Sequence, residues 1–247
     1  HHLADLESTA EIGARAGTRA VARLNPGKAP VGKLPIIIDP RVGGSIVGHL
    51  LGAIAGPSIA RGTSFLLGKE EQALFDSGIL IRDEPHRPRG LRSRAFDGEG
   101  LPTAARDIVS GGRITGWLLD TASAKQLGLS PTGHASRGGG ASGVSASNLH
   151  LAAGSLSPEA LMADIKEGIY VTELIGQGVN PVTGDYSRGA SGFVIRDGAI
   201  AGPIAEFTIA GNLVDMFAAL VPANDLEFRH ATNVPTLRID GMTVASS

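Results

Sequence analysis

Residues Tyr170 to Phe193 read YVTELIGQGVNPVTGDYSRGASGF, and this stretch is the most informative part of the chain. It is strand-like and nearly free of Lys, Ala and Leu, but glycines recur through it at Gly176, Gly178, Gly184, Gly189 and Gly192. A glycine weakens a strand unless it permits a bend, a bulge or the close approach of another backbone. So many glycines in one segment predict a shaped surface rather than plain scaffold.

The composition describes a globular chain with many turns. The sequence has 247 residues, 42% of them hydrophobic, which is enough to bury a substantial core. Its 35 glycines and 14 prolines exceed the usual share of these two residues, roughly 12%. This excess favours turns and bent strands over a helical bundle.

Charge and cysteine content exclude several classes of protein. The formal net charge is −2, so we expect no direct nucleic-acid binding, which needs a clustered basic surface. The absence of cysteine excludes disulfides, thiolate metal sites and cysteine nucleophiles. No apolar run approaches the ~20 residues of a membrane span. We therefore expect a cytoplasmic protein without a membrane partner.

Helices are predicted in four places. Residues 4–24 carry apolar side chains at near-helical intervals, and 45–54 is apolar nearly all round, which predicts a buried helix. Ser157 and Pro158 have the features of a helix start, and that helix is expected to stop at Gly168. A short helix is expected at 212–220.

The remaining pattern predicts strands. The apolar run at 34–39 is typical of a buried strand. Apolar runs separated by turn residues predict three hairpins, at 108–118, at 192–204 around Asp197-Gly198, and at 237–244 around Asp240-Gly241.

The fold class that follows is α+β, with a bent antiparallel β-sheet or partial barrel made of hairpins and flanked by a few helices. We find no internal repeat and no linker, so residues 1–247 are predicted to form a single domain. Residues 132–147 are rich in Gly and Ser and are predicted to be a mobile loop. Gly138, Gly140 and Gly143 match G-x-G-x-x-G, but they lack the flanking strand and helix that dinucleotide binding requires.

His49 lies on the predicted helix at 45–54. A metalloprotease helix would place a second His and a Glu one turn away, so that the donors share a metal. One turn before His49 stand Ser45 and Ile46, and one turn after it stands Ala53. A lone imidazole is no zinc site, so we interpret His49 as a hydrogen-bonded structural residue.

Long segments of the chain resemble the PmbA (TldE) branch of the TldD/PmbA family. The resemblance spans essentially the whole sequence and corresponds to the C-terminal part of a full-length member, without the family's N-terminal domain. The segments are YVTELIGQGVNPVTGDYSRGASGF at 170–193, IAGNLVDMF at 209–217, NDLEF at 224–228 and PTLRIDGMTV at 235–244, with VGHLLGAIAG at 47–56, FDGEGLPT at 96–103 and LLDTASAKQLGLSPTGHA at 118–135 upstream.

The resemblance implies a link to modulation of DNA gyrase and to peptide-processing metalloproteases. The TldD branch carries a zinc-binding H-E-x-x-x-H helix, and the PmbA branch pairs with it as a partner that lacks the motif. Placed on this sequence, the motif falls on Gly44, Ser45 and His49. Glycine has no donor atom and serine no carboxylate, so a zinc ion would not be held. The resemblance therefore implies no catalytic residue, no metal and no cofactor here, and His49 is the only retained motif position.

The function implied is that of a non-catalytic subunit. It would form a heterodimer with a TldD-like zinc metalloprotease and help to hold an unstructured, extended peptide for cleavage. Alternatively, the same residues only fix a turn and an interface. The candidate peptide or interface contacts are Asp185, Tyr186, Ser187, Arg188, Gln177 and Asn180.

Two other functions stay open at this point. One is a metal-independent hydrolase, which needs a nucleophile and base that we do not find in the sequence. The other is a purely structural protein that forms a homodimer, since homodimers are the commonest symmetric assembly.

Overall fold

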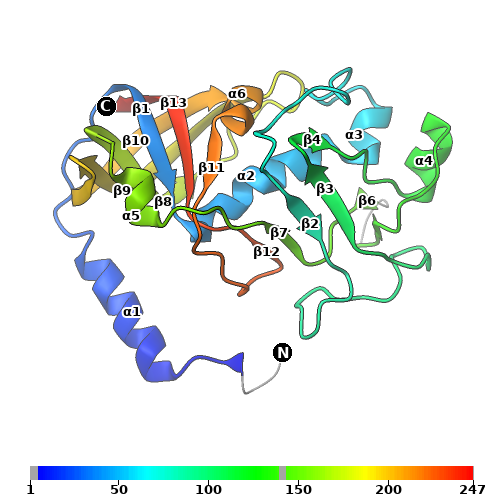
Figure 1. Ribbon diagram of the computed structural model, residues 1–247, viewed down its shortest axis with the longest axis horizontal. Coiled ribbons are helices and arrows are strands. Elements are labelled where there is room, and N and C mark those ends of the chain that lie inside the picture. The colour runs from blue at the N-terminus through cyan, green and yellow to red at the C-terminus, as the bar shows by residue number, and fades with distance from the viewer. Residues whose placement is uncertain (1–4, 139–142, 247) are drawn as a thin grey trace.

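A barrel closed by five strands organises the structure, a computed structural model that describes residues 5–138 and 143–246. The strands follow the order β1-β8-β9-β10-β13, and β1 also pairs with β13 to close the ring (Figure 1). A short strand, β11, pairs with the start of β13. Their bounds are β1 Gly32–Ile38, β8 Glu167–Ile175, β9 Asp185–Arg196, β10 Ala199–Asn212, β11 Leu220–Pro222 and β13 Leu237–Ser246.

One pair in the barrel is parallel. β1 and β8 run in the same direction, with Ile36 opposite Ile169, and the other neighbours in the ring are antiparallel. Parallel neighbours need a crossover connection, and here residues 39–166 supply it. The predicted α+β class with a bent sheet or partial barrel is confirmed. The ring is closed and contains this one parallel pair, which local sequence patterns do not reveal.

A second sheet lies beside the barrel (Figure 1), and all of its strands except β12 come from the crossover. Its order is β12-β7-β2-β3-β4, and β3 with β4 forms the first predicted hairpin. A further pair joins β5 and β6. The bounds are β2 Ile81–Asp83, β3 Arg106–Ser110, β4 Arg113–Ile114, β5 Ala135–Ser136, β6 Gly143–Val144, β7 Leu149–Leu151 and β12 Thr232–Asn233.

Helix α2 (Pro40–Ala53) joins the two sheets through a common hydrophobic core. It begins at Pro40 rather than at the predicted residue 45. Asp39 caps it by accepting a hydrogen bond from the backbone N–H of Arg41 at 2.9 Å, and proline fits the first helical position because that N–H has no partner within the helix. Its buried residues are Gly43, Ile46, Val47, Leu50 and Ala53.

Five other helices lie among the described residues. α6 confirms the short helix predicted at 212–220, and Asn212 caps it. None of the helices in residues 5–138 and 143–246 has the length and hydropathy that a membrane span requires. The bounds are α1 Thr9–Val21, α3 Gly56–Ala60, α4 Thr121–Leu127, α5 Pro158–Met162 and α6 Leu213–Ala218.

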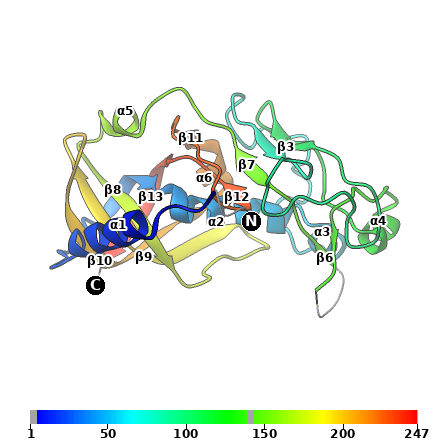
Figure 2. The same cartoon turned by 90° about the horizontal axis from the view of Figure 1, so that it is seen from below.

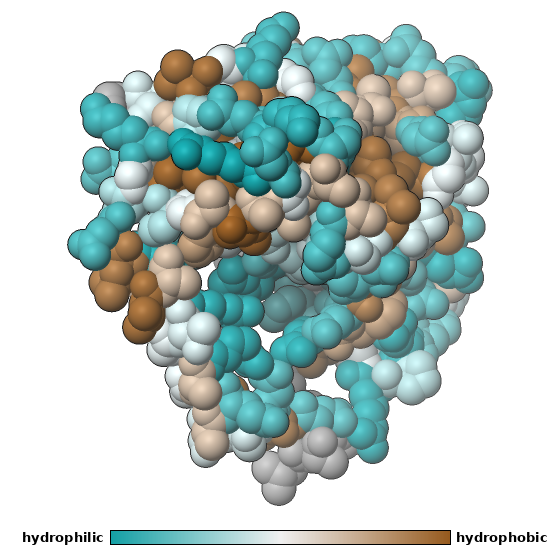
Figure 3. Space-filling model, turned by 60° about the vertical axis from the view of Figure 1, so that its left-hand side comes forward, coloured by the Kyte–Doolittle hydropathy of each residue, from teal (hydrophilic) through white to brown (hydrophobic). Residues whose placement is uncertain are grey.

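Helix α1 confirms the amphipathic helix predicted at 4–24, of which residue 4 lies outside the described residues. Ser8 and Glu11 form a reciprocal capping box at its start. None of its residues is buried, and Ile12 on its apolar face is 47% exposed. The helix lies below the barrel in Figure 1 and in front of it in the view from below (Figure 2), and Figure 3 shows the N-terminal segment standing off from the body of the molecule.

The hairpin predicted at 237–244 is wrong. β13 runs without a turn through Asp240 and Gly241, and these two residues face a single residue, Pro35, of β1. They form a β-bulge, and the φ of 80° at Gly241 is the left-handed conformation that such a bulge requires. By contrast, Asp197 and Gly198 both have positive φ and form the predicted turn between β9 and β10.

The helix stop predicted at Gly168 is also wrong. α5 ends at Met162, and Gly168 is the second residue of β8. A Cβ atom on Gly168 would lie 2.8 Å from the carbonyl oxygen of Pro35. The glycine therefore allows β8 to approach β1 and does not end a helix.

The segment predicted as a mobile loop, 132–147, is described in part. Gly140 of its glycine pattern lies outside the described residues, together with the rest of 139–142. On either side of that gap, Ala135–Ser136 pairs with Gly143–Val144. Whether the segment is mobile stays a prediction.

Candidate functional site

The pleat of β9 divides the predicted contact residues between two faces. Successive side chains of a strand point to opposite sides, so Asp185 and Ser187 are exposed while Tyr186 is buried and Arg188 half-buried. Tyr186 belongs to the core beside α2. The four consecutive residues therefore do not form one surface.

The loop before β9 uses its polar residues to hold its own shape. Asn180 Oδ1 accepts hydrogen bonds from the backbone N–H groups of Val182 at 2.9 Å and Thr183 at 3.3 Å, which is an Asx turn. The exposed Gln177 lies at the start of this loop, and its carbonyl accepts from the N–H of Val179 at 2.7 Å. Asp185 accepts from the hydroxyl of Thr183 at 2.6 Å. These contacts favour a turn-fixing role for the loop.

Backbone groups at the start of β9 are already paired within the chain. The N–H of Ser187 donates to the carbonyl of Gly178 at 2.7 Å, and β10 occupies the other side of the strand. A Cβ atom on Gly178 would clash with the carbonyl of Ser187. The close backbone approach that the glycines predict is therefore made by this chain itself, and a peptide cannot add here as a new strand.

His49 on α2 lies beside Tyr186 and Arg188 of β9, and we call these three residues the α2–β9 cluster. The rings of His49 and Tyr186 meet edge to face, with centroids 5.9 Å apart. His49 Nε2, Tyr186 Oη and Arg188 Nε are all buried and have no hydrogen-bond partner among the described residues. A buried polar atom without a partner costs about 1–3 kcal/mol. The interpretation of His49 as hydrogen-bonded is therefore wrong at Nε2.

The electrostatics of the α2–β9 cluster follow from burial and from one unpaired charge. Burial lowers the pKa of His49, and the charge of Arg188 lowers it further. Burial also raises the pKa of Tyr186 to about 12, although Arg188 opposes that rise. At neutral pH the cluster thus presents a neutral imidazole, a phenol and a guanidinium. In the part of the chain that the structure describes, Arg188 has no carboxylate partner.

The zinc motif positions do not fit a metal ion. Gly44 offers no donor atom, and the hydroxyl of Ser45 donates to the carbonyl of Val42 at 2.7 Å. No group of three His, Asp or Glu side chains that could hold a metal is found within residues 5–138 and 143–246. A guanidinium beside His49 further disfavours a cation there. We therefore derive no chemistry through a metal in this chain.

A serine, a histidine and an aspartate do meet at the end of β2 in the second sheet. Ser147 Oγ donates to Asp83 Oδ1 at 2.6 Å, and His134 Nε2 lies 3.4 Å from Asp83 Oδ2. Both partners thus bond to the carboxylate, and the serine does not bond to the imidazole as a nucleophile must. All three side chains are buried. The contacts hold the group together inside the fold, and no local sequence pattern identifies it because its members are far apart in the chain.

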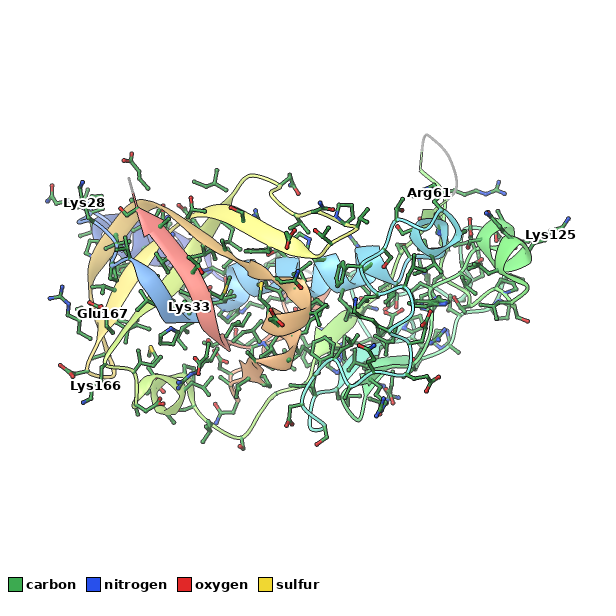
Figure 4. The ribbon with its side chains drawn as sticks, turned by 90° about the horizontal axis from the view of Figure 1, so that it is seen from above. Lys28, Lys33, Arg61, Lys125, Lys166 and Glu167 are labelled. Carbon is green, nitrogen blue, oxygen red and sulfur yellow. The ribbon has the colours of Figure 1, made fainter. Side chains whose placement is uncertain are left out.

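Other charged groups lie on the surface. A hollow of about 480 Å³ is lined by Glu84, His86, Arg87, Pro88 and Ala105. Figure 4 places Arg61 and Lys125 at one end of the molecule and Lys28, Lys166 and Glu167 at the other. The labelled cations are thus spread over both ends, and the absence of nucleic-acid binding stays a prediction.

Comparison with known proteins gives concordant results. Residues 31–246 match the family model of the PmbA/TldA metallopeptidase C-terminal domain. The metalloprotease PmbA of Escherichia coli O157:H7 is 41% identical over 244 residues, which cover 98% of this chain and 52% of that protein. The PmbA homolog of Haemophilus influenzae is 39% identical, with 98% and 52% covered.

A solved structure shows the same fold. TldE from Thermococcus kodakarensis superposes with a TM-score of 0.85 at 25% identity, covering 96% of this chain and 55% of that one. The chain thus spans about half the length of the relatives it matches. On the strength of the family model and of relatives above 30% identity, the chain belongs to the PmbA branch of the PmbA/TldD family, in the region of its C-terminal metallopeptidase domain.

Proposed function

We propose that this chain acts as a non-catalytic subunit that pairs with a TldD-like zinc metalloprotease in the cytoplasm and helps to hold an unstructured peptide for cleavage. The observation that carries the proposal is the donor set on α2. Where zinc ligands and a general base would stand, Gly44 and Ser45 supply no usable group, and only His49 is retained. In this proposal, the partner binds the zinc ion and carries out the cleavage.

Contacts to the peptide or the partner would be made by side chains. The backbone of β9 is paired on both sides near Ser187, so main-chain strand addition is not available there. Asp185 and Ser187 face outward beside the exposed Gln177. Arg188, on the other face of the strand, offers an unpaired charge to an incoming group.

The decisive experiment mixes the protein with a TldD-like partner and follows cleavage of an unstructured peptide. We expect no cleavage by the chain alone, and cleavage by the pair that a strong chelator abolishes. An Asp185→Ala, Arg188→Ala double variant should reduce cleavage by the pair, whereas Lys166→Ala, at an 88% exposed side chain on the barrel's end, should not. If the double variant binds the partner and supports full cleavage, the contact assignment fails.

Two outcomes would favour other functions. Peptide turnover by the chain alone that survives the chelator would indicate a metal-independent hydrolase. The arrangement of Asp83, His134 and Ser147 gives no support to that outcome. A stable homodimer in sedimentation, unaffected by a TldD-like partner, would indicate a purely structural assembly protein.

A further inference from the structure

We propose that His49, Tyr186 and Arg188 form a binding site for a carboxylate group, placed where α2 and β9 meet. This inference deepens the proposed function, on which it rests, by naming the group of the peptide that the subunit would recognise. The site lies at the one position of the zinc motif that this chain retains.

Three polar atoms without partners converge at this place. Tyr186 is only 1% exposed and interacts with the side chain of Arg188, but no hydrogen bond of ordinary geometry reaches its Oη, Nε2 of His49 or Nε of Arg188. Most buried polar groups in native proteins are paired, so three such atoms on neighbouring side chains call for a ligand that pairs them. The phenol and the guanidinium are both hydrogen-bond donors, and His49 becomes one in the tautomer with its proton on Nε2.

The charge of Arg188 points to an anion. The half-buried Arg238 of β13 has a carboxylate partner, Asp240, at 2.9 Å, and the exposed Arg41 of α2 contacts Asp39 at 2.7 Å. Arg188 has none among the described residues. A guanidinium presents a planar set of N–H donors that matches the two oxygens of a carboxylate.

The charge count selects a carboxylate over a phosphate. The cluster supplies a single full positive charge, because burial keeps His49 neutral and Tyr186 protonated. A carboxylate carries one negative charge, whereas a phosphate group carries close to two at neutral pH. One guanidinium, one phenol and one imidazole therefore match a carboxylate in both charge and number of donors.

The helix face beside His49 leaves room for an approaching chain. Gly48 and Gly52 are exposed and lie one turn apart on α2. A Cβ atom on either glycine would meet nothing within 4 Å. A peptide backbone can therefore come close to the helix next to the cluster.

A direct test uses acetate as the probe on the full chain and follows the imidazole resonances of His49 by NMR, assigned with a His49→Gln variant. We expect a saturable shift with acetate, no such shift with the neutral analogue acetamide, and loss of the acetate response in Arg188→Gln. An Arg196→Gln variant, altered at the exposed far end of the same strand, should respond as the wild type does. No saturable shift, or an equal shift in Arg188→Gln, would overturn the proposal.

Peptides then identify the source of the carboxylate. Three otherwise identical peptides are compared by fluorescence anisotropy on the assembled pair: one with a free C-terminus, one amidated, and one amidated with a single internal Glu. Preference for the first assigns the site to a peptide C-terminus, and preference for the third to an acidic side chain. In either case Arg188→Gln should weaken binding about tenfold or more, and Tyr186→Phe, which keeps the ring, should weaken it less.

Equal binding of the three peptides would overturn the carboxylate site while leaving the proposed function standing. The proposed function has its own test: it fails if the pair cleaves the peptide no better than the partner does alone. The acetate titration does not depend on that result, because it needs neither partner nor cleavage.

Discussion

Single side chains decide what the surface between α2 and β9 can bind. Sequence spacing identifies His49 as a lone imidazole, and it identifies Tyr186 and Arg188 as polar residues of a glycine-rich strand. Only the tertiary fold brings these residues together, because they are far apart in the chain and no local pattern links them. The resulting cluster has unpaired donors and one positive charge, which suits an anion and disfavours a metal.

The lowered pKa of His49 predicts a pH-dependent loss of stability. Because burial holds this pKa below its usual value of about 6.5, the unfolded state binds more protons than the folded state once the pH falls below about 6.5. Stability from this residue is therefore present above that pH and is lost as the pH falls toward the folded-state pKa. Urea unfolding of the wild type and of His49→Gln at pH 7.5 and 5.5 measures the effect.

The His49→Gln variant should lose less stability between these two pH values than the wild type loses. His150, whose pKa burial also lowers, is present in both proteins, so its contribution cancels in the comparison. Equal losses in the two proteins would contradict the assignment of a neutral, buried imidazole to His49.

Asp83 is predicted to stabilise the fold and to have no role in catalysis. Burial alone would raise its pKa, but hydrogen bonds from His134 and Ser147 outweigh burial and lower it. Asp83→Ala leaves two buried partners unpaired and should cost about 3 kcal/mol in urea unfolding. Asp107→Ala, which removes a half-exposed partner of Arg82 on the next strand, should cost less than about 1 kcal/mol.

Activity separates this structural role from a catalytic one. Once the folded fraction is equal, the Asp83→Ala chain should support peptide cleavage by the pair as well as the wild type does. A loss of cleavage in fully folded protein would instead give the buried group a chemical role.

At the scale of elements, the dipeptide Asp-Gly adopts two different structures in this chain. Asp197-Gly198 forms the predicted turn, whereas Asp240-Gly241 forms a bulge inside β13. Local sequence identifies the need for a left-handed glycine in both places. It does not decide between a turn and a bulge, because that depends on β1 and β10, which pair with β13. The α+β class and most helices could be predicted, since they rest on local periodicity and capping.

The bulge predicts a penalty for a side chain at position 241. With a φ of 80° and open space around it, Gly241→Ala should destabilise the chain by about 1–2 kcal/mol through backbone strain alone. Gly202→Ala in β10 is the matched control, because Gly202 also has open space but no left-handed φ. Chemical denaturation of both variants compares them, and equal stabilities would contradict a strained bulge at Gly241.

At the scale of the whole molecule, the hydrophobic core fixes the position of α2, although this helix lacks two of the three zinc-motif residues. Ile46, Val47 and Leu50 anchor the helix in the core, so its packing does not depend on a metal. The family's fold is thus retained while two of the three motif positions, Gly44 and Ser45, offer no ligand. In the proposed function, the partner binds the metal ion and this chain contacts the peptide.

Metal content tests this account most directly. The protein is purified without a nickel column, incubated with zinc, freed of excess ion by gel filtration and measured by mass spectrometry, with an anomalous-scattering map at the zinc edge in crystals. We predict well below one zinc per chain and no anomalous peak near His49. One zinc per chain with a peak beside His49 would contradict the non-catalytic assignment.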